Sequence, residues 1–189
     1  MTMVDARGSS RVTGSHSATD AMLQCAENFA AARRTGSEPI RARPARPATG
    51  VAVLACMDAR LDVNTLLGLD EGDAHILRNA GGVVTDDMIR SLAVSQHQLG
   101  TTEIILLHHT QCGMMTVTDD GFREQLFERT GFRPPWPVHA FGDLEVDVRT
   151  SVARLRASPF LAASTSVRGF IYDVVSGVLR EVDAGAEVA

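Results

Sequence analysis

Two short segments of the sequence hold side chains that could bind and activate a metal ion. The first, CMDARLD, places Cys56, Asp58 and Arg60 two residues apart, and the second, HHTQCG, places His109 and Cys112 three residues apart. Thiolate sulfur and neutral imidazole nitrogen are preferred ligands of zinc. Three such ligands, from Cys56, His109 and Cys112, leave a fourth coordination position open, which is typical of catalytic zinc sites.

An open zinc site is a Lewis acid and a source of hydroxide near neutral pH. Two thiolates neutralise the formal charge of Zn²⁺, so the metal acidifies its water less than it does with three histidines, and a nearby proton acceptor becomes useful. We expect Asp58 to be this acceptor, and Arg60 to keep it oriented and ionised through a bidentate ion pair. Without the pair, Asp58 could itself ligate the metal and close the site.

The two segments can meet only if the fold brings them to one edge of a sheet. Short apolar runs typical of strands buried in a parallel sheet cover residues 50–57, 74–78 and 103–108. The carboxyl ends of such strands lie at one edge, where α/β proteins bind ligands. If the first strand continues to residue 60, Cys56, Asp58 and Arg60 point to one side of it.

Helical patterning separates the strands, and we expect helices at residues 19–34, 86–99, from about residue 112, at 119–130 and at 143–157. Residues 167–183 predict two strands joined at Ser176 and Gly177, a hairpin signal. The predicted fold class is α/β, with a mainly parallel central sheet flanked by helices, a C-terminal hairpin strand and an N-terminal helical arm.

The step from strand to helix near Cys112 explains how residues three apart could converge on one metal. Cys112 is expected in the first turn of that helix, where the helix dipole favours the thiolate. Side chains alternate along a strand, so His108 is predicted to face away from His109 and to pack or support the site.

The composition suits one globular domain, since 44% of the 189 residues are hydrophobic and 22% are charged. We expect a disordered tail at 1–18, a domain at 19–183 that includes a helix at 19–34 and a linker arm at 35–49, and a tail at 184–189. A net charge of −5 argues against a nucleic-acid partner. The chain has neither an apolar run long enough for a membrane span nor a secretory signal, and its three cysteines favour a reducing, cytoplasmic location.

The order CMDAR, NAGG and HHTQCG resembles that of the β-class carbonic anhydrases. The resemblance implies reversible hydration of CO₂ to bicarbonate and a proton, with zinc bound by Cys56, His109 and Cys112. It implies that Asp58 and Arg60 form the catalytic dyad. It also implies that Gly81 and Gly82 lie near the substrate pocket, and that the N-terminal helix crosses onto a neighbouring subunit of a homodimer or larger oligomer.

Several alternatives remain open on the sequence alone. The same fold could hydrolyse a CO₂ relative, carbonyl sulfide or carbon disulfide. It could instead be a non-catalytic zinc-binding or bicarbonate-sensing module, with Asp58 as a permanent fourth ligand. A thiol-redox role would leave His109 unused. The proton could leave through any of three histidines, His75, His97 or His139.

Overall fold

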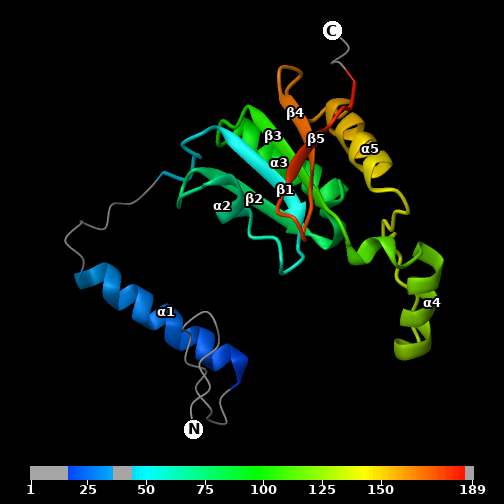
Figure 1. The fold of residues 1–189 in the computed structure, drawn as a ribbon, viewed down its shortest axis with the longest axis horizontal. Coiled ribbons are helices and arrows are strands. Elements are labelled where there is room, and N and C mark those ends of the chain that lie inside the picture. The colour runs from blue at the N-terminus through cyan, green and yellow to red at the C-terminus, as the bar shows by residue number, and fades with distance from the viewer. Residues whose placement is uncertain (1–16, 36–43, 186–189) are drawn as a thin grey trace. The chain divides into compact units, whose positions relative to one another are not determined.

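The computed structural model describes residues 17–35 and 44–185. They belong to two compact units, divided after Arg43 (Figure 1). The predicted tails at 1–18 and 184–189 and the linker arm at 35–49 fall largely outside the described residues, so the predicted domain limits of 19–183 stay a prediction. No helix in the described part of the chain is long and apolar enough to cross a membrane.

The described residues of the first unit, 17–35, form one helix, α1 (Ala18–Thr35), which confirms the predicted N-terminal helix. Its start is fixed by a reciprocal pair of hydrogen bonds. Asp20 N donates to Ser17 Oγ at 3.1 Å, and Ser17 N donates to Asp20 Oδ2 at 2.9 Å. Three large apolar side chains of α1 are exposed, namely Met22, Leu23 and Phe29.

The second unit is built on a five-stranded sheet with the order β2-β1-β3-β4-β5 (Figure 1). The strands are β1 (Val51–Cys56), β2 (Ala74–Asn79), β3 (Glu103–His109), β4 (Ser166–Tyr172) and β5 (Leu179–Val182). The first four run parallel, and β5 pairs antiparallel with β4, as predicted for the hairpin. In the turn between them, Asp173 Oδ1 accepts from the main-chain N–H groups of Val175 and Ser176.

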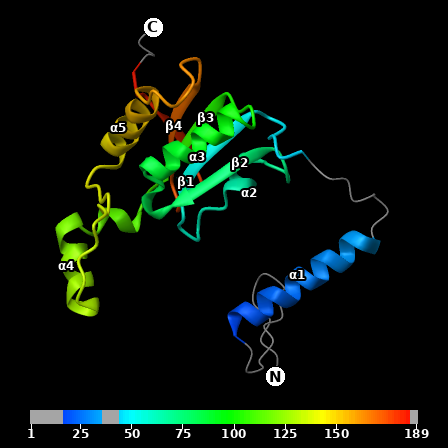
Figure 2. The same ribbon diagram turned by 180° about the vertical axis from the view of Figure 1, so that it is seen from behind.

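Four α-helices accompany the sheet: α2 (Val63–Leu67), α3 (Asp86–His97), α4 (Asp119–Thr130) and α5 (Leu144–Arg156). Each begins after a side chain that caps a free N–H group, from Asp62, Thr85, Thr118 or Asp143. In Figure 2, α3 and α5 lie in front of the sheet and α2 lies behind it.

Two apolar layers lie on the two faces of the sheet. One joins β1, β3 and β4 to α3 and α5, and its residues include Leu54, Leu92, Leu106 and Val152. The other contains Val53, Leu61, Leu107 and Phe141, together with two cysteines, Cys56 and Cys112. The inner strands β1 and β3 are therefore buried on both faces, which explains their nearly continuous apolar sequences.

One local prediction differs from the structure, and one short helix was not predicted. The predicted helix from about Cys112 is a 3₁₀ turn, Gly113–Met115, and Cys112 precedes it instead of lying in a first α-helical turn. Three residues are too few to form an α-helix, so little helix dipole acts on the thiol. The short helix α2 was not predicted, because five residues are too few to show a helical period.

Candidate metal centre

The three predicted metal ligands lie together at the carboxyl edge of the sheet. Cys56 is the last residue of β1, His109 is the last residue of β3, and Cys112 follows after two residues. Because β1 and β3 are parallel neighbours, their ends reach the same edge. The ligand atoms of the three residues lie within 4.8 Å of one another.

The spacing of these atoms suits a tetrahedral zinc ion. The Sγ atoms of Cys56 and Cys112 are 3.9 Å apart, and tetrahedral zinc with Zn–S bonds of about 2.3 Å places two sulfurs about 3.8 Å apart. All three side chains are buried, with exposed fractions of 4% for Cys56, 0% for His109 and 2% for Cys112. Backbone shifts are not needed to bring the sulfurs to bonding distance of one metal.

The hydrogen bonding of His109 leaves its other ring nitrogen available. Its Nδ1 lies 2.9 Å from the main-chain oxygen of Thr110, to which it donates as the protonated nitrogen. Its Nε2 is buried and has no hydrogen-bond partner among the described residues. A buried polar atom without a partner is costly, and a metal ion would satisfy it. The donor set and this free nitrogen therefore fit zinc.

The two thiols share one proton when no metal holds them. The hydrogen bond with Cys112 lowers the pKa of Cys56 to about 4, in opposition to burial. The same hydrogen bond, together with burial, raises the pKa of Cys112. Burial opposes ionisation of His109, but the neighbouring Cys56 sulfur raises the pKa of the imidazole overall. A bound metal would require both thiolates and the neutral imidazole, so its binding releases protons.

Asp58 and Arg60 form the bidentate ion pair that was expected of them. Arg60 Nε donates to Asp58 Oδ1 at 2.9 Å, and Arg60 Nη2 donates to Asp58 Oδ2 at 2.7 Å. The pair holds the pKa of the Asp58 carboxyl well below its usual range. Asp58 Oδ2 also lies 3.7 Å from His109 Nε2, so the carboxylate lies next to the metal centre and is separate from the three ligands.

A turn, and not a continued strand, places this pair. The strand β1 ends at Cys56, and Arg60 N donates to Asp58 Oδ1 at 2.9 Å while Leu61 N donates to Asp58 O at 3.0 Å. The strand therefore does not continue to residue 60, which was the condition for Cys56, Asp58 and Arg60 to point to one side of it. A side-chain-to-backbone turn of this kind is typical of aspartate and competes with strand structure.

The two glycines make room for the metal ligands and their neighbours. A Cβ atom on Gly82 would lie 2.8 Å from Cys56 N and 3.0 Å from Ala55 C, so only glycine fits beside the end of β1. A Cβ atom on Gly81 would lie 3.0 Å from Met114 Cγ and 3.2 Å from Phe141 Cε1. Both residues have positive φ angles, of 83° and 70°.

Two further residues at this edge were missed from the sequence. Arg78, next to the end of β2, donates from Nε to Cys56 O at 2.9 Å and from Nη2 to Asp58 O at 2.7 Å. Gln111 accepts hydrogen bonds from Arg60. The position of Arg78 at the end of a strand was a usable signal, because β2 neighbours β1, whereas nothing in the sequence singled out Gln111.

Three described histidines, His75, His97 and His108, lie apart from the ligand cluster or face away from it. His108 is fully buried and its Nε2 lies 2.7 Å from Asp147 of α5, so it packs on the opposite side of β3 from His109. His75 is the second residue of β2, at the far end of the strand from Cys56, and it contacts Ser95 and Ala45. This placement makes His75 a poor candidate for proton transfer.

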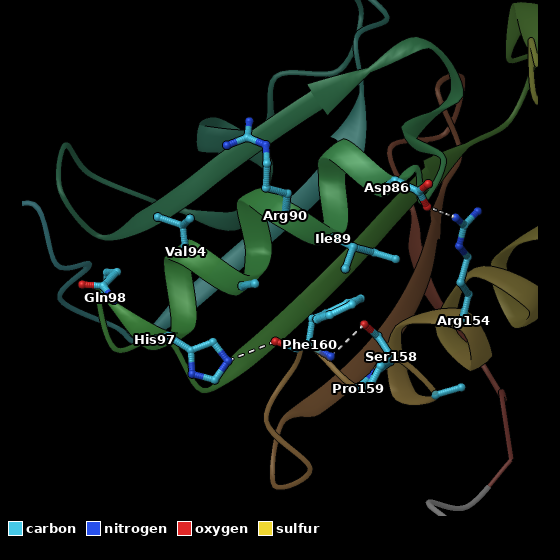
Figure 3. Close-up of a pocket in the computed structure, with 12 residues that line it drawn as sticks. Asp86, Ile89, Arg90, Val94, His97, Gln98, Arg154, Ser158, Pro159 and Phe160 are labelled. Atoms are coloured by element: carbon cyan, nitrogen blue, oxygen red, sulfur yellow. Dashed lines mark hydrogen bonds and ion pairs between the residues drawn. The ribbon is translucent and has the colours of Figure 1, made fainter. Parts of the chain in front are cut away.

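An apolar groove lies between α3 and the segment that follows α5, and it contains none of the predicted metal ligands and neither Asp58 nor Arg60 (Figure 3). Its volume is about 750 Å³. Ile89 and Phe160 form its apolar walls, an ion pair between Asp86 and Arg154 borders it, and His97 Nε2 lies 3.0 Å from Phe160 O. His97, another predicted route for the proton, is thus engaged in this groove.

Comparison with known proteins identifies the family. The sequence model of the carbonic anhydrase family matches residues 51–136. "Beta-carbonic anhydrase 1" of Mycobacterium tuberculosis is 55% identical over 139 residues, which are 74% of this chain and 85% of that protein. A carbon disulfide hydrolase of Acidithiobacillus thiooxidans is 34% identical over 149 residues, covering 68% of this chain and 74% of the relative.

Solved structures agree with the sequence relatives. The crystal structure of carbonic anhydrase from Streptococcus mutans superposes with a TM-score of 0.81 at 44% identity, and the match covers 90% of this chain and all of that one. Sequence similarity and fold therefore agree, and this chain belongs to the β-carbonic anhydrase family.

Proposed function

We propose that Cys56, His109 and Cys112 hold the zinc ion with which this enzyme catalyses the reversible hydration of CO₂ to bicarbonate and a proton. The observation that supports this most is the convergence of two buried sulfurs and the free Nε2 of His109 on one point. When bound there, zinc supplies a Lewis acid that makes water a nucleophile near neutral pH.

The proposed role of Asp58 is to accept a hydrogen bond from the attacking water. Its Oδ2 is on the side of the carboxylate that faces His109, while Oδ1 accepts two hydrogen bonds from Arg60. Arg60 keeps the carboxylate ionised and fixed in direction. One proton is released to solvent for each CO₂ hydrated, and Asp58, with its lowered pKa, orients the water without keeping that proton.

The pocket for CO₂ is proposed on the apolar side of the same centre. Gly81 borders Met114 and Phe141, and both side chains pack in the layer that contains Cys56 and Cys112. An apolar wall suits a small, uncharged substrate. Gly82 lets the backbone approach β1, so the glycine pair shapes the pocket through its lack of side chains.

The test is stopped-flow CO₂ hydration from about pH 6.5 to 9, with zinc quantified in each sample. Asp58→Asn should lower kcat/KM by about 10- to 100-fold, the usual effect of losing an orienting partner beside a metal centre, while one zinc per chain is retained. Asp87→Asn, which alters an exposed carboxylate paired with Arg90 on α3, is the matched control and should leave the rate unchanged.

Two results would contradict the proposal. Zinc-loaded wild-type enzyme without CO₂ turnover at any pH would favour a non-catalytic zinc-binding or bicarbonate-sensing module, with Asp58 as a fourth ligand. Full activity in Asp58→Asn would remove Asp58 from the reaction.

Carbon disulfide or carbonyl sulfide hydrolysis is the second candidate. It is favoured by the carbon disulfide hydrolase that is 34% identical to this chain. The same ligands would serve either substrate, since the difference lies in access to the pocket. Sulfide release from carbon disulfide, measured beside CO₂ hydration on the same preparation, separates the two activities.

We also propose a homodimer or larger oligomer in the cytoplasm. The exposed Met22, Leu23 and Phe29 give α1 an apolar surface suited to a second subunit. The three cysteines are all free, as expected in a reducing compartment. Light scattering after size-exclusion chromatography measures the oligomer, and a monomer at micromolar concentration would contradict it.

A further inference from the structure

We propose that Gln111 is a positioning residue that holds Arg60 in the orientation in which it clamps Asp58. The inference rests on the function proposed above, in which Arg60 orients Asp58. Gln111 lies between His109 and Cys112, so the segment that carries two metal ligands also carries this contact.

The donors of Arg60 show how the contact is made. The guanidinium group has five N–H donors. Two of them donate to the oxygens of Asp58. A further Nη2–H donates to the main-chain oxygen of Gln111 at 3.1 Å, and Nη1 donates to Gln111 Oε1 at 3.3 Å. In the part of the chain that the structure describes, Gln111 is the only partner of this side chain other than Asp58.

The ion pair alone is a weak restraint on the direction of Asp58. Arg60 is 48% exposed, so water competes for its donors. Both residues also belong to one short turn, and Arg78 holds its backbone beside β1, through Cys56 O and Asp58 O. Hydrogen bonds to Gln111 tie this turn to the segment after β3, and therefore fix Asp58 relative to the metal ligands.

The backbone of Gln111 supports the same interpretation. Its φ angle is 56°, in the left-handed region that residues other than glycine, asparagine and aspartate seldom adopt. Such a conformation persists only where the surroundings maintain it. Here the main-chain oxygen and the side-chain oxygen of one residue both accept from Arg60.

Two substitutions separate the side-chain contact from the backbone. Gln111→Asn keeps an amide and tolerates the left-handed conformation, but it is one methylene shorter and loses the contact with Nη1. Gln111→Glu keeps the length and the acceptor. Gln98→Asn, at the exposed end of α3, is the matched control for shortening an amide.

The first readout is the rate at which the Arg60 Nε–H exchanges with solvent, measured by ¹H–¹⁵N NMR on the zinc-loaded enzyme. Arg60→Lys identifies the signal by its loss. Gln111→Asn should accelerate exchange about 3- to 10-fold, the net effect of one partly exposed hydrogen bond, because a guanidinium no longer held at Nη1 releases its Nε–H from Asp58 more often. Gln111→Glu keeps an acceptor for Nη1 and should not accelerate exchange, and Gln98→Asn should change nothing.

The second readout is the pair of constants kcat and KM for CO₂ hydration. Gln111→Asn should lower kcat by a similar factor with little change in KM and unchanged zinc content, because it disorders Asp58 and removes no substrate contact. Native exchange in Gln111→Asn, or equal acceleration in Gln111→Asn and Gln111→Glu, would overturn the inference. Loss of the proposed function is distinguishable, since it would appear as an inactive wild type whose Arg60 exchange still responds to Gln111.

Discussion

Replacement of Gly82 by alanine tests whether the close approach of two backbones creates the metal centre. The new Cβ would lie 2.8 Å from Cys56 N and 3.0 Å from Ala55 C. Neither atom belongs to a flexible side chain. The end of β1 would have to move roughly 0.6 Å for the closest pair to reach 3.4 Å, where ordinary contact begins. Cys56 would move with it.

A matched substitution isolates this steric effect. Gly68 has φ 64°, close to the 70° of Gly82, but no atom lies within 4 Å of its Cβ position. Gly68→Ala therefore has only the cost of the left-handed conformation, about 1–2 kcal/mol. Gly82→Ala adds overpacking of about 1–3 kcal/mol, so its free energy of unfolding should fall by about 2–5 kcal/mol.

Zinc affinity should separate the two variants more clearly than stability does. Metal–ligand distances tolerate errors of about 0.2 Å, which is less than the shift forced on Cys56. We expect Gly82→Ala to bind zinc about 10- to 100-fold more weakly and Gly68→Ala to bind it normally. The assays are urea unfolding of both variants and zinc competition against a chromophoric chelator. Equal zinc affinities in the two variants would refute the reasoning.

Two further predictions concern residues that fix loops around the centre. Arg78→Met should remove the donors that hold Cys56 O and Asp58 O, and it should weaken zinc binding several-fold, which corresponds to the free energy of about one hydrogen bond. Arg90→Met, at a 69% exposed arginine, is the control, and equal effects of the two substitutions on zinc binding would argue against the role of Arg78. Asp119 accepts hydrogen bonds from three main-chain N–H groups, chiefly that of Ala140, and these bonds lower the pKa of its carboxyl group. The carboxylate therefore stabilises the fold above the unfolded pKa of about 3.9, and this stabilisation is lost as the pH falls through the folded pKa. Asp119→Asn should therefore cost about 1–2 kcal/mol at pH 7 and progressively less below about pH 4, as measured by urea midpoints; a difference independent of pH would contradict this.

The sequence predicted the sheet because its inner strands are buried on both faces. Continuous apolar runs such as 51–56 and 104–107 have few other structural explanations, and the parallel arrangement then brings Cys56 and His109 to one edge. Alternation along β3 also predicted that His108 would face away from His109, toward what proved to be Asp147 of α5.

What the sequence did not predict depends on contacts between distant segments. Arg78 and Gln111 act through hydrogen bonds to residues 20 to 51 positions away, and no local pattern encodes such pairs. The turn at residues 57–60 was not predicted, because the two-residue spacing of Cys56, Asp58 and Arg60 fits both a strand and an aspartate turn. Phe141 had no motif to link it to Cys112, although the two pack in one apolar layer.

The groove beside α3 has a practical consequence for inhibitor discovery. It has a volume of about 750 Å³ and apolar walls, and it shares no residue with the ligand cluster. A compound library screened by thermal shift would be expected to select molecules that fill the groove, raise the melting temperature and leave turnover untouched. Hits against this enzyme should therefore be ranked by inhibition of hydration first, with binding measured only afterwards.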